Sequence, residues 1–257
     1  MYKKIVEYLS GQFERGRPIL VSGAGFSSYA KNLKGEPVPS GPKLAEKIWG
    51  LVYPDVEYEE KTQLQDIFEI AKAQCRTSLI SLLNEHLIID PSKSDLSAYE
   101  KIFLYPWYRS YTLTADNLDK VLNTHYMFRR KLLAIDGMAE KSISTDSIGS
   151  IADNLFSIHL NGIFERDPDA ITFGRLQYAR RTRFADPWYS IFTTEIMTHS
   201  VVFIGTTLDE PPLWEHIEQR DIKGGRGVRE NRPWSFLITR DLSKPRADLL
   251  KQYNVEW

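Results

Sequence analysis

The stretch ILVSGAGFSSYAKN, residues 19–32, joins a short apolar run to a glycine-rich turn. The apolar run Ile19–Val21 is typical of a strand that is buried on both faces of a sheet. Gly23–Gly25 follows it, and Phe26-Ser27 would open a helix. Glycines at such a strand end let a phosphate approach the backbone, and a helix N-terminus offers free N–H groups. The stretch therefore predicts a phosphate-binding loop. A plain tight turn remains the alternative, because Ser28 stands where the dinucleotide fingerprint has glycine or alanine.

Composition narrows the class of protein. A chain of 257 residues with 42% hydrophobic and 26% charged residues is ordinary for one large globular domain, or for one domain with an insertion. The net charge of −1 gives no general attraction to nucleic acid or to an anionic membrane. Cys75 is the only cysteine, which rules out an internal disulfide and a four-cysteine zinc site, and we expect no metal. Without a long apolar run or a signal peptide, the sequence predicts a soluble cytoplasmic protein with no membrane partner.

Strand-like and helix-like segments alternate along most of the chain. This alternation predicts an α/β fold with a parallel sheet and helices on both faces. Residues 43–104 are helical in pattern and follow the first strand, so we expect them to form a small helical insertion module. The segments expected to be strands are 19–21, 108–114, 154–162, 169–174, the start of 199–217, 233–239 and 254–257. The segments expected to be helices outside the module are 2–14, the start of 115–126, 184–198, the end of 199–217 and 242–253.

Polar residues at two further strand ends are candidates for chemistry. Asn117 and Asp119 follow the strand at 108–114, where an amide could orient a water molecule or a sugar hydroxyl. Helix capping by Asp116 and Asn117 is the alternative. His159 and Asn161 lie two apart near the end of the strand at 154–162, so we expect them to face the same way. A histidine there could act as a general base near neutral pH, or it could simply bond to the backbone.

The segment VVFIGTTLDEPPLW, residues 201–214, ends a strand with a glycine. Gly205 and Thr206 could lie under an adenosine ribose. The acids and prolines that follow at 209–212 are explained by the start of a helix, where negative charge and proline are favoured. The helix start does not explain the glycine.

The four stretches together resemble the sirtuin-like domains that consume NAD, in particular those of bacterial anti-phage defence proteins. The resemblance rests on the order of Gly23–Ser27, Thr114–Asp119, Leu160–Gly162 and Phe203–Pro211. It implies a Rossmann-like sheet with a helical module, and it implies cleavage of NAD at the nicotinamide–ribose bond. The residues that it assigns to NAD binding are Gly23, Ala24, Gly25, Phe26, Ser27, Asp119, Gly205 and Thr206. The residues that it assigns to catalysis are Asn117, which would orient water and ribose, and position 161 or His159 as the base.

Three departures from the family pattern matter. The second motif carries an extra residue and has Leu118 in place of an aromatic. The zinc cysteines of deacylating sirtuins are missing, which favours NAD hydrolysis over deacylation. Asn161 stands where the family has its catalytic histidine, and asparagine cannot accept a proton near pH 7. His159 could take over this role, the protein could bind NAD without cleaving it, or Asn161 could be an engineered substitution.

The resemblance therefore implies an NAD glycohydrolase, residues 1–257, that releases nicotinamide and ADP-ribose as an anti-phage effector. The alternatives are an impaired module that binds NAD or an ADP-ribose derivative and, more distantly, a protein deacylase. NADP and cyclic ADP-ribose relatives remain open as ligands. Because a last strand is expected just before Trp257, we expect an N-terminal part of a longer protein whose other domains sense infection and drive self-association. Direct nucleic-acid binding is not expected.

Overall fold

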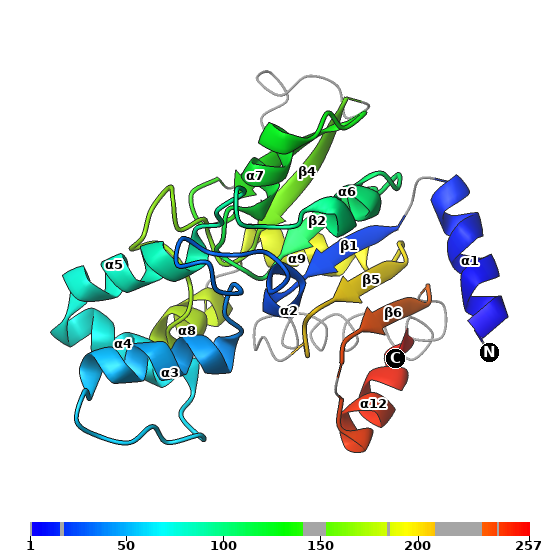
Figure 1. Ribbon diagram of the computed structural model, residues 1–257. Coiled ribbons are helices and arrows are strands. Elements are labelled where there is room, and N and C mark those ends of the chain that lie inside the picture. The colour runs from blue at the N-terminus through cyan, green and yellow to red at the C-terminus, as the bar shows by residue number, and fades with distance from the viewer. Residues whose placement is uncertain (1, 16–17, 141–152, 184–185, 209–232, 241) are drawn as a thin grey trace.

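The computed structural model describes residues 2–15, 18–140, 153–183, 186–208, 233–240 and 242–257. Its strands form one seven-stranded sheet in the order β3-β4-β2-β1-β5-β6-β7, and every pair is parallel. Helices cover both faces of the sheet (Figure 1), which confirms the predicted α/β, Rossmann-like class. The strands are β1 (Ile19–Ser22), β2 (Arg109–Thr112), β3 (Lys131–Asp136), β4 (Asn154–His159), β5 (Val201–Ile204), β6 (Ser235–Ile238) and β7 (Val255–Glu256).

The sheet grows in both directions from β1. The chain passes from β1 to β2 on one side, and it later returns to place β5 on the other side. In an open parallel sheet this reversal leaves a crevice at the carboxyl ends of the strands, which is where ligands usually bind. The register places Ser22 beside Thr112 and Thr112 beside His159. Three polar strand ends thus meet at one edge of the sheet.

Alternate side chains of the buried strands feed two apolar layers. Ile19 and Val21 belong to one layer, which α9 (Pro187–Glu195) and α12 (Lys244–Lys251) help to form. Leu20 belongs to the other layer, which includes residues of α6 (Ser97–Phe103) and α7 (Leu118–His125).

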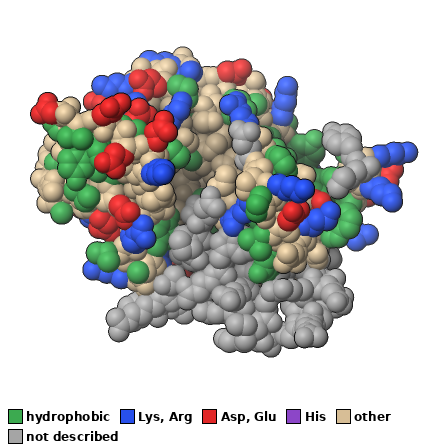
Figure 2. Space-filling view, turned by 90° about the horizontal axis from the view of Figure 1, so that it is seen from below, with side chains coloured by type: hydrophobic (Ala, Val, Ile, Leu, Met, Phe, Trp, Pro, Cys, Tyr) green, Lys and Arg blue, Asp and Glu red, His purple; other side chains and the backbone are tan. Residues whose placement is uncertain are grey.

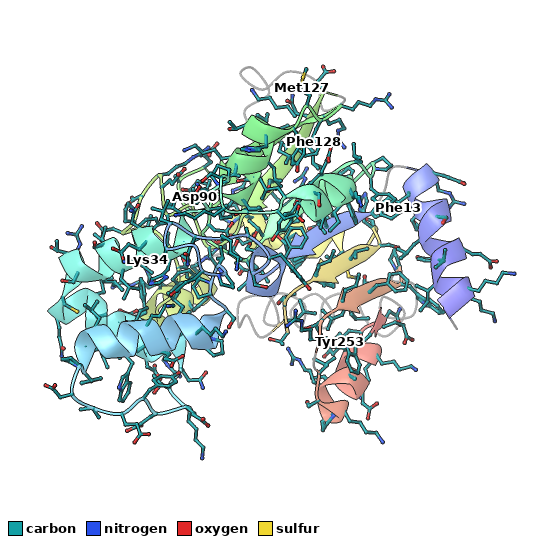
Figure 3. The ribbon with its side chains drawn as sticks, viewed as in Figure 1. Phe13, Lys34, Asp90, Met127, Phe128 and Tyr253 are labelled. Atoms are coloured by element: carbon teal, nitrogen blue, oxygen red, sulfur yellow. The ribbon has the colours of Figure 1, made fainter. Side chains whose placement is uncertain are left out.

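The N-terminal helix α1 (Tyr2–Glu14) belongs to the same layer as α6 and α7. Its Phe13, labelled in Figure 3, packs edge-on against Trp107 with 4.8 Å between the ring centroids. A helix over residues 2–14 is confirmed, and an aromatic contact fastens its end to the segment that leads into β2.

The helical module has a hydrophobic core of its own. It is built from α3 (Gly41–Val52), α4 (Leu64–Gln74) and α5 (Arg76–Leu87), which lie together at one side of the sheet (Figure 1). The helix α8 (Arg175–Arg183) packs against α4. Seen from below, the described surface carries acidic and basic side chains intermingled over the module (Figure 2), as expected for a chain of near-zero net charge.

Some predicted elements differ from the structure. The segment 169–174 is not a strand, because its apolar residues Ile171 and Phe173 point into the core of the helical module. The edge strand β3 and the helix α8 were not predicted. The helix expected at the end of 199–217 lies outside the described residues.

Candidate functional site

A polar cavity lies at the carboxyl edge of the sheet, on the face that α7 covers. It has a volume of about 20 Å³, room for about one water molecule, and it is partly open to solvent. Its floor comes from β1, β2 and β4, and its walls come from the short helix α2 (Ala24–Ser27), from α6 and from the start of α7. The lining residues are Ser22, Phe26, Ser27, Phe103, Ser110, Thr112, Asp116, Leu118, Asp119, Ser157 and His159.

The polarity of this floor follows from strand alternation. On β2, Tyr111 points into the apolar layer behind the sheet, so its neighbours Ser110 and Thr112 point to the α7 face. On β4, Ile158 points into the same apolar layer, so its neighbours Ser157 and His159 point to the α7 face. Such strands, buried on both faces, would normally carry apolar residues on both sides. Hydroxyl and imidazole groups on one face therefore mark a place where the sheet lines a polar site.

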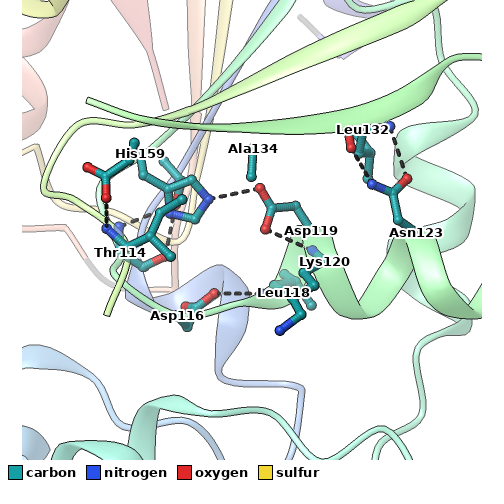
Figure 4. Close-up of polar contacts among 12 residues, drawn as sticks. Thr114, Asp116, Leu118, Asp119, Lys120, Asn123, Leu132, Ala134 and His159 are labelled. Atoms are coloured by element: carbon teal, nitrogen blue, oxygen red, sulfur yellow. Dashed lines mark hydrogen bonds and ion pairs between the residues drawn. The ribbon is translucent and has the colours of Figure 1, made fainter. Parts of the chain in front are cut away.

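His159 and Asp119 form the central pair of the cavity. The His159 Nε2 and the Asp119 Oδ2 are 2.8 Å apart, and the two side chains are only 2% and 7% exposed (Figure 4). Burial opposes a charged imidazole, but the Asp119 carboxylate outweighs that cost and raises the pKa of His159. Burial likewise opposes the charge on Asp119, but the imidazolium lowers the pKa of this carboxyl below its usual range. The pair is thus mutually stabilised in its ionised form.

Asp116 is a second buried carboxyl in the same cavity. Its Oδ1 accepts the N–H of Leu118 at 3.1 Å, which caps the start of α7 (Figure 4). Burial raises the pKa of Asp116; the nearby Ser27 hydroxyl and the His159 charge oppose this but do not outweigh it. The other oxygen, Oδ2, has no hydrogen-bond partner among the described residues, and the same is true of the His159 Nδ1. Two buried polar atoms of residues that line one cavity therefore lack a well-formed hydrogen bond to a described residue, although Thr114 lies near both side chains and Ser27 lies near Asp116.

Asn117 lies at the N-cap position of α7 but is not among the residues that line the cavity. Its Oδ1 accepts the N–H of Ile89 at 2.9 Å, and its Nδ2 donates to Glu165 Oε1 at 3.0 Å. Lys120 donates to the other oxygen of Glu165 at 2.7 Å. The amide thus ties α7 to the end of the helical module and to the loop after β4. The capping bond itself comes from Asp116, one residue earlier.

Asn161 is also held by protein groups at both ends of its amide. Its Nδ2 donates to the carbonyl of Leu113 at 2.9 Å, and its Oδ1 accepts from Arg181 at 3.1 Å. Arg181 in turn forms a buried ion pair with Asp186 at 2.7 Å. Since β4 ends at His159 and the chain then turns, strand alternation does not extend to Asn161. His159 lines the cavity, whereas Asn161 is not among its lining residues.

The glycine loop and the end of β5 pack backbone against backbone. The Gly25 N–H donates to the carbonyl of Gly205 at 2.8 Å. A Cβ at Gly23 would lie 2.6 Å from the Gly205 oxygen and 2.7 Å from Thr206 Cβ. A Cβ at Gly25 would lie 2.9 Å from that oxygen, and Ala24 begins α2 between the two glycines. The approach of these two loops at the switch point therefore requires the glycines, whatever ligand binds there.

The structure brings together only some of the predicted site residues. The cavity lining includes four of them, which are Phe26, Ser27, Asp119 and His159. Asp116, for which the sequence indicates only a helix cap, also lines the cavity. The polar alternation of Ser110 and Thr112 along β2 was the available signal for this site.

Within the described part of the chain, His, Cys, Asp and Glu side chains are nowhere grouped so as to hold a metal ion. Among the described helices, none is long and apolar enough to cross a membrane.

A family profile described as SIR2-like domain matches residues 110–257, which is more than half of the chain. The chain therefore belongs to the SIR2-like family, in agreement with the sirtuin-like resemblance of its motifs. SIR2-like domains use NAD. The match includes α7 and His159 but begins after the glycine loop, and no curated protein matches the chain.

Proposed function

We propose that this protein is an NAD glycohydrolase that releases nicotinamide and ADP-ribose, with His159 as its general base. The observation that carries the proposal is the His159–Asp119 pair at the carboxyl edge of the sheet. The bond between Nε2 and Asp119 Oδ2 orients the ring, and it leaves the buried Nδ1 without a hydrogen bond to a described residue. A base held by a carboxylate on its far nitrogen is a recurring arrangement for activating a nucleophile.

The chemistry of the cavity fits one end of the dinucleotide. Among the described residues that line the cavity are carboxyl and hydroxyl groups but neither lysine nor arginine, the side chains that usually bind phosphate. NAD carries its positive charge on the nicotinamide ring, and charge moves to the ribose as the bond between them breaks. The buried Asp119 carboxylate, whose pKa is lowered, complements that charge. The cavity has a volume of about 20 Å³, room for about one water molecule, so its walls would have to move apart for the nicotinamide end of NAD to enter.

The remaining site residues have supporting roles in this proposal. Gly23–Ser27 would lie along the pyrophosphate, and Gly205 and Thr206 would lie near the adenosine ribose. Asn117 would orient ribose and water, which requires it to exchange its bond with Glu165 for one with the substrate. Asn161 would hold the turn after β4, since Leu113 and Arg181 already engage its amide.

A second candidate function is binding of NAD, or of an ADP-ribose derivative, without cleavage. The observation that favours it is the state of the two amides: both Asn117 and Asn161 are bonded at each end to protein groups. In this alternative the site senses a nucleotide. The anti-phage role, in which activated hydrolysis depletes NAD, rests on the family resemblance alone.

Nicotinamide release from NAD separates the two candidates. We expect release by the unaltered protein and a loss of about 10²–10⁴-fold in His159→Asn, which removes the base. His125→Asn is the matched control, because His125 is exposed at the end of α7 and should leave the rate unchanged. Measurable NAD binding with no release from the unaltered protein or from Asn161→His would reject hydrolysis and favour the binding module.

A further inference from the structure

The inference concerns the two unpartnered atoms of the cavity and rests on the proposed hydrolysis. Asp116 Oδ2 and His159 Nδ1 belong to side chains that are each 2% exposed. Both residues line the same cavity at the ends of neighbouring strands and their following loop. Buried polar atoms of this kind are nearly always hydrogen-bonded to protein or to ordered water. The surrounding Ser22, Ser27 and Thr112 hydroxyls make the cavity polar enough to hold water.

We propose that one ordered water molecule bridges Asp116 Oδ2 and His159 Nδ1, and that this water is the nucleophile of the hydrolysis. A water molecule has two O–H donors and two lone pairs, so two protein partners fix its orientation. The contact with Asp116 is available in either protonation state, since a carboxylate accepts from water and a carboxyl group donates to it. Asp116 is thereby assigned as a further catalytic residue.

The reaction step balances without another reactant. The oxygen of the water forms a bond to C1′ of the ribose, while the bond from C1′ to the nicotinamide nitrogen breaks. Nicotinamide leaves as a neutral base with the bonding electron pair. The step requires neutral His159, the form that dominates above its raised pKa, and the water gives one proton to its Nδ1. Asp119 stabilises the imidazolium that forms from the other side of the ring.

Asp116 also has a structural task that a test must separate from catalysis. Its Oδ1 caps α7 through the N–H of Leu118. Asp95 makes the matching contact at the start of α6, where its Oδ1 accepts the N–H of Ser97 at 3.0 Å. Asp95 is exposed and does not line the cavity. Asp95→Ala is therefore the matched control for the loss of such a cap.

Kinetics should divide the variants by their ability to bind water. We expect Asp116→Ala to lower kcat by about 10²-fold with KM for NAD changed no more than about twofold, because only the reacting water is lost. Asp116→Asn should keep kcat within about tenfold, since its amide can still bond to water. Asp95→Ala should keep kcat unchanged. Equal, small effects of Asp116→Ala and Asp95→Ala would overturn the assignment.

A crystal structure of the unliganded protein tests the water site independently of activity. We expect one water within about 3.2 Å of both Asp116 Oδ2 and His159 Nδ1. A dry cavity in a protein that releases nicotinamide would overturn the water site while leaving hydrolysis intact. A bound water in a protein that releases no nicotinamide would support the water site and reject the proposed hydrolysis.

Discussion

Replacement of Asp119 by asparagine tests the electrostatics of the site in isolation from catalysis. The change preserves the shape of the side chain but removes the charge that faces His159. Both partners are almost fully buried, at 2% and 7% exposed side-chain area, so solvent screens the pair weakly. Removing one member of such a pair typically costs about 3–5 kcal/mol, because the other charge is left buried and uncompensated. We expect about 3 kcal/mol for Asp119→Asn, since an imidazole can release its proton.

The loss should depend on pH in a defined direction. The pKa of His159 is raised, so its contribution to stability is complete below its ordinary value of 6.5 and is lost as the pH rises through the raised value. The pKa of Asp119 is lowered, so its contribution is complete above 3.8 and is lost as the pH falls through the lowered value. The effect of Asp119→Asn should therefore be largest between about pH 4 and 6.5 and smaller at pH 9.

Urea unfolding at pH 5.5 and pH 9 measures this effect. The matched control is Asp66→Asn, which removes the charge from an exposed ion pair with Arg175 and should leave the unfolding midpoint unchanged. A loss below about 1 kcal/mol for Asp119→Asn at pH 5.5, or an equal loss at the two pH values, would refute the reasoning, because a buried ionised pair predicts neither result.

Two further predictions concern the packing around the site. Gly25→Ala should lower the free energy of unfolding in urea by about 1–3 kcal/mol, because its Cβ would lie 2.9 Å from the carbonyl oxygen of Gly205. The control is Gly50→Ala, where the Cβ meets nothing within 4 Å, and it should not destabilise the protein in the same titration. Arg181→Met should cost about 3–5 kcal/mol by urea unfolding, because it strands the buried charge of Asp186; a loss below about 1 kcal/mol would contradict the buried pair.

The sheet was largely predictable, because it depends on short-range patterns. Continuous apolar runs such as Ile19–Val21 and Val201–Ile204 predict strands buried on both faces, and both are strands of the sheet. The edge strand at Lys131–Asp136 has an apolar run of similar length, but its leucines and alanine favour a helix as readily as a strand, so it gives a weaker signal. The helix Arg175–Arg183 lacks apolar periodicity, because it is rich in arginine. The alternating apolar residues at 169–174 belong instead to a loop, whose side chains pack into the core of the helical module.

The site was less predictable, because it depends on how distant segments meet. The positions of Asp119 and His159 at strand ends follow from the sequence. Their contact depends on the parallel register of β2 and β4 and on the first turn of α7. Whether Asp116 or Asn117 faces the cavity depends on a single residue step within one loop. Sequence patterns indicate where the strands end, but they do not indicate which residue of the following loop faces the cavity.

The central claim is that NAD binds at this edge of the sheet, with its reacting ribose over His159. A crystal structure of the His159→Asn variant with NAD tests this claim most directly. We predict that C1′ of the nicotinamide ribose lies within about 4 Å of residue 159, a separation close to that of reacting atoms. We also predict that the pyrophosphate runs along Gly23–Ser27. A dinucleotide bound elsewhere, or with its adenine end in the cavity, would contradict the claim.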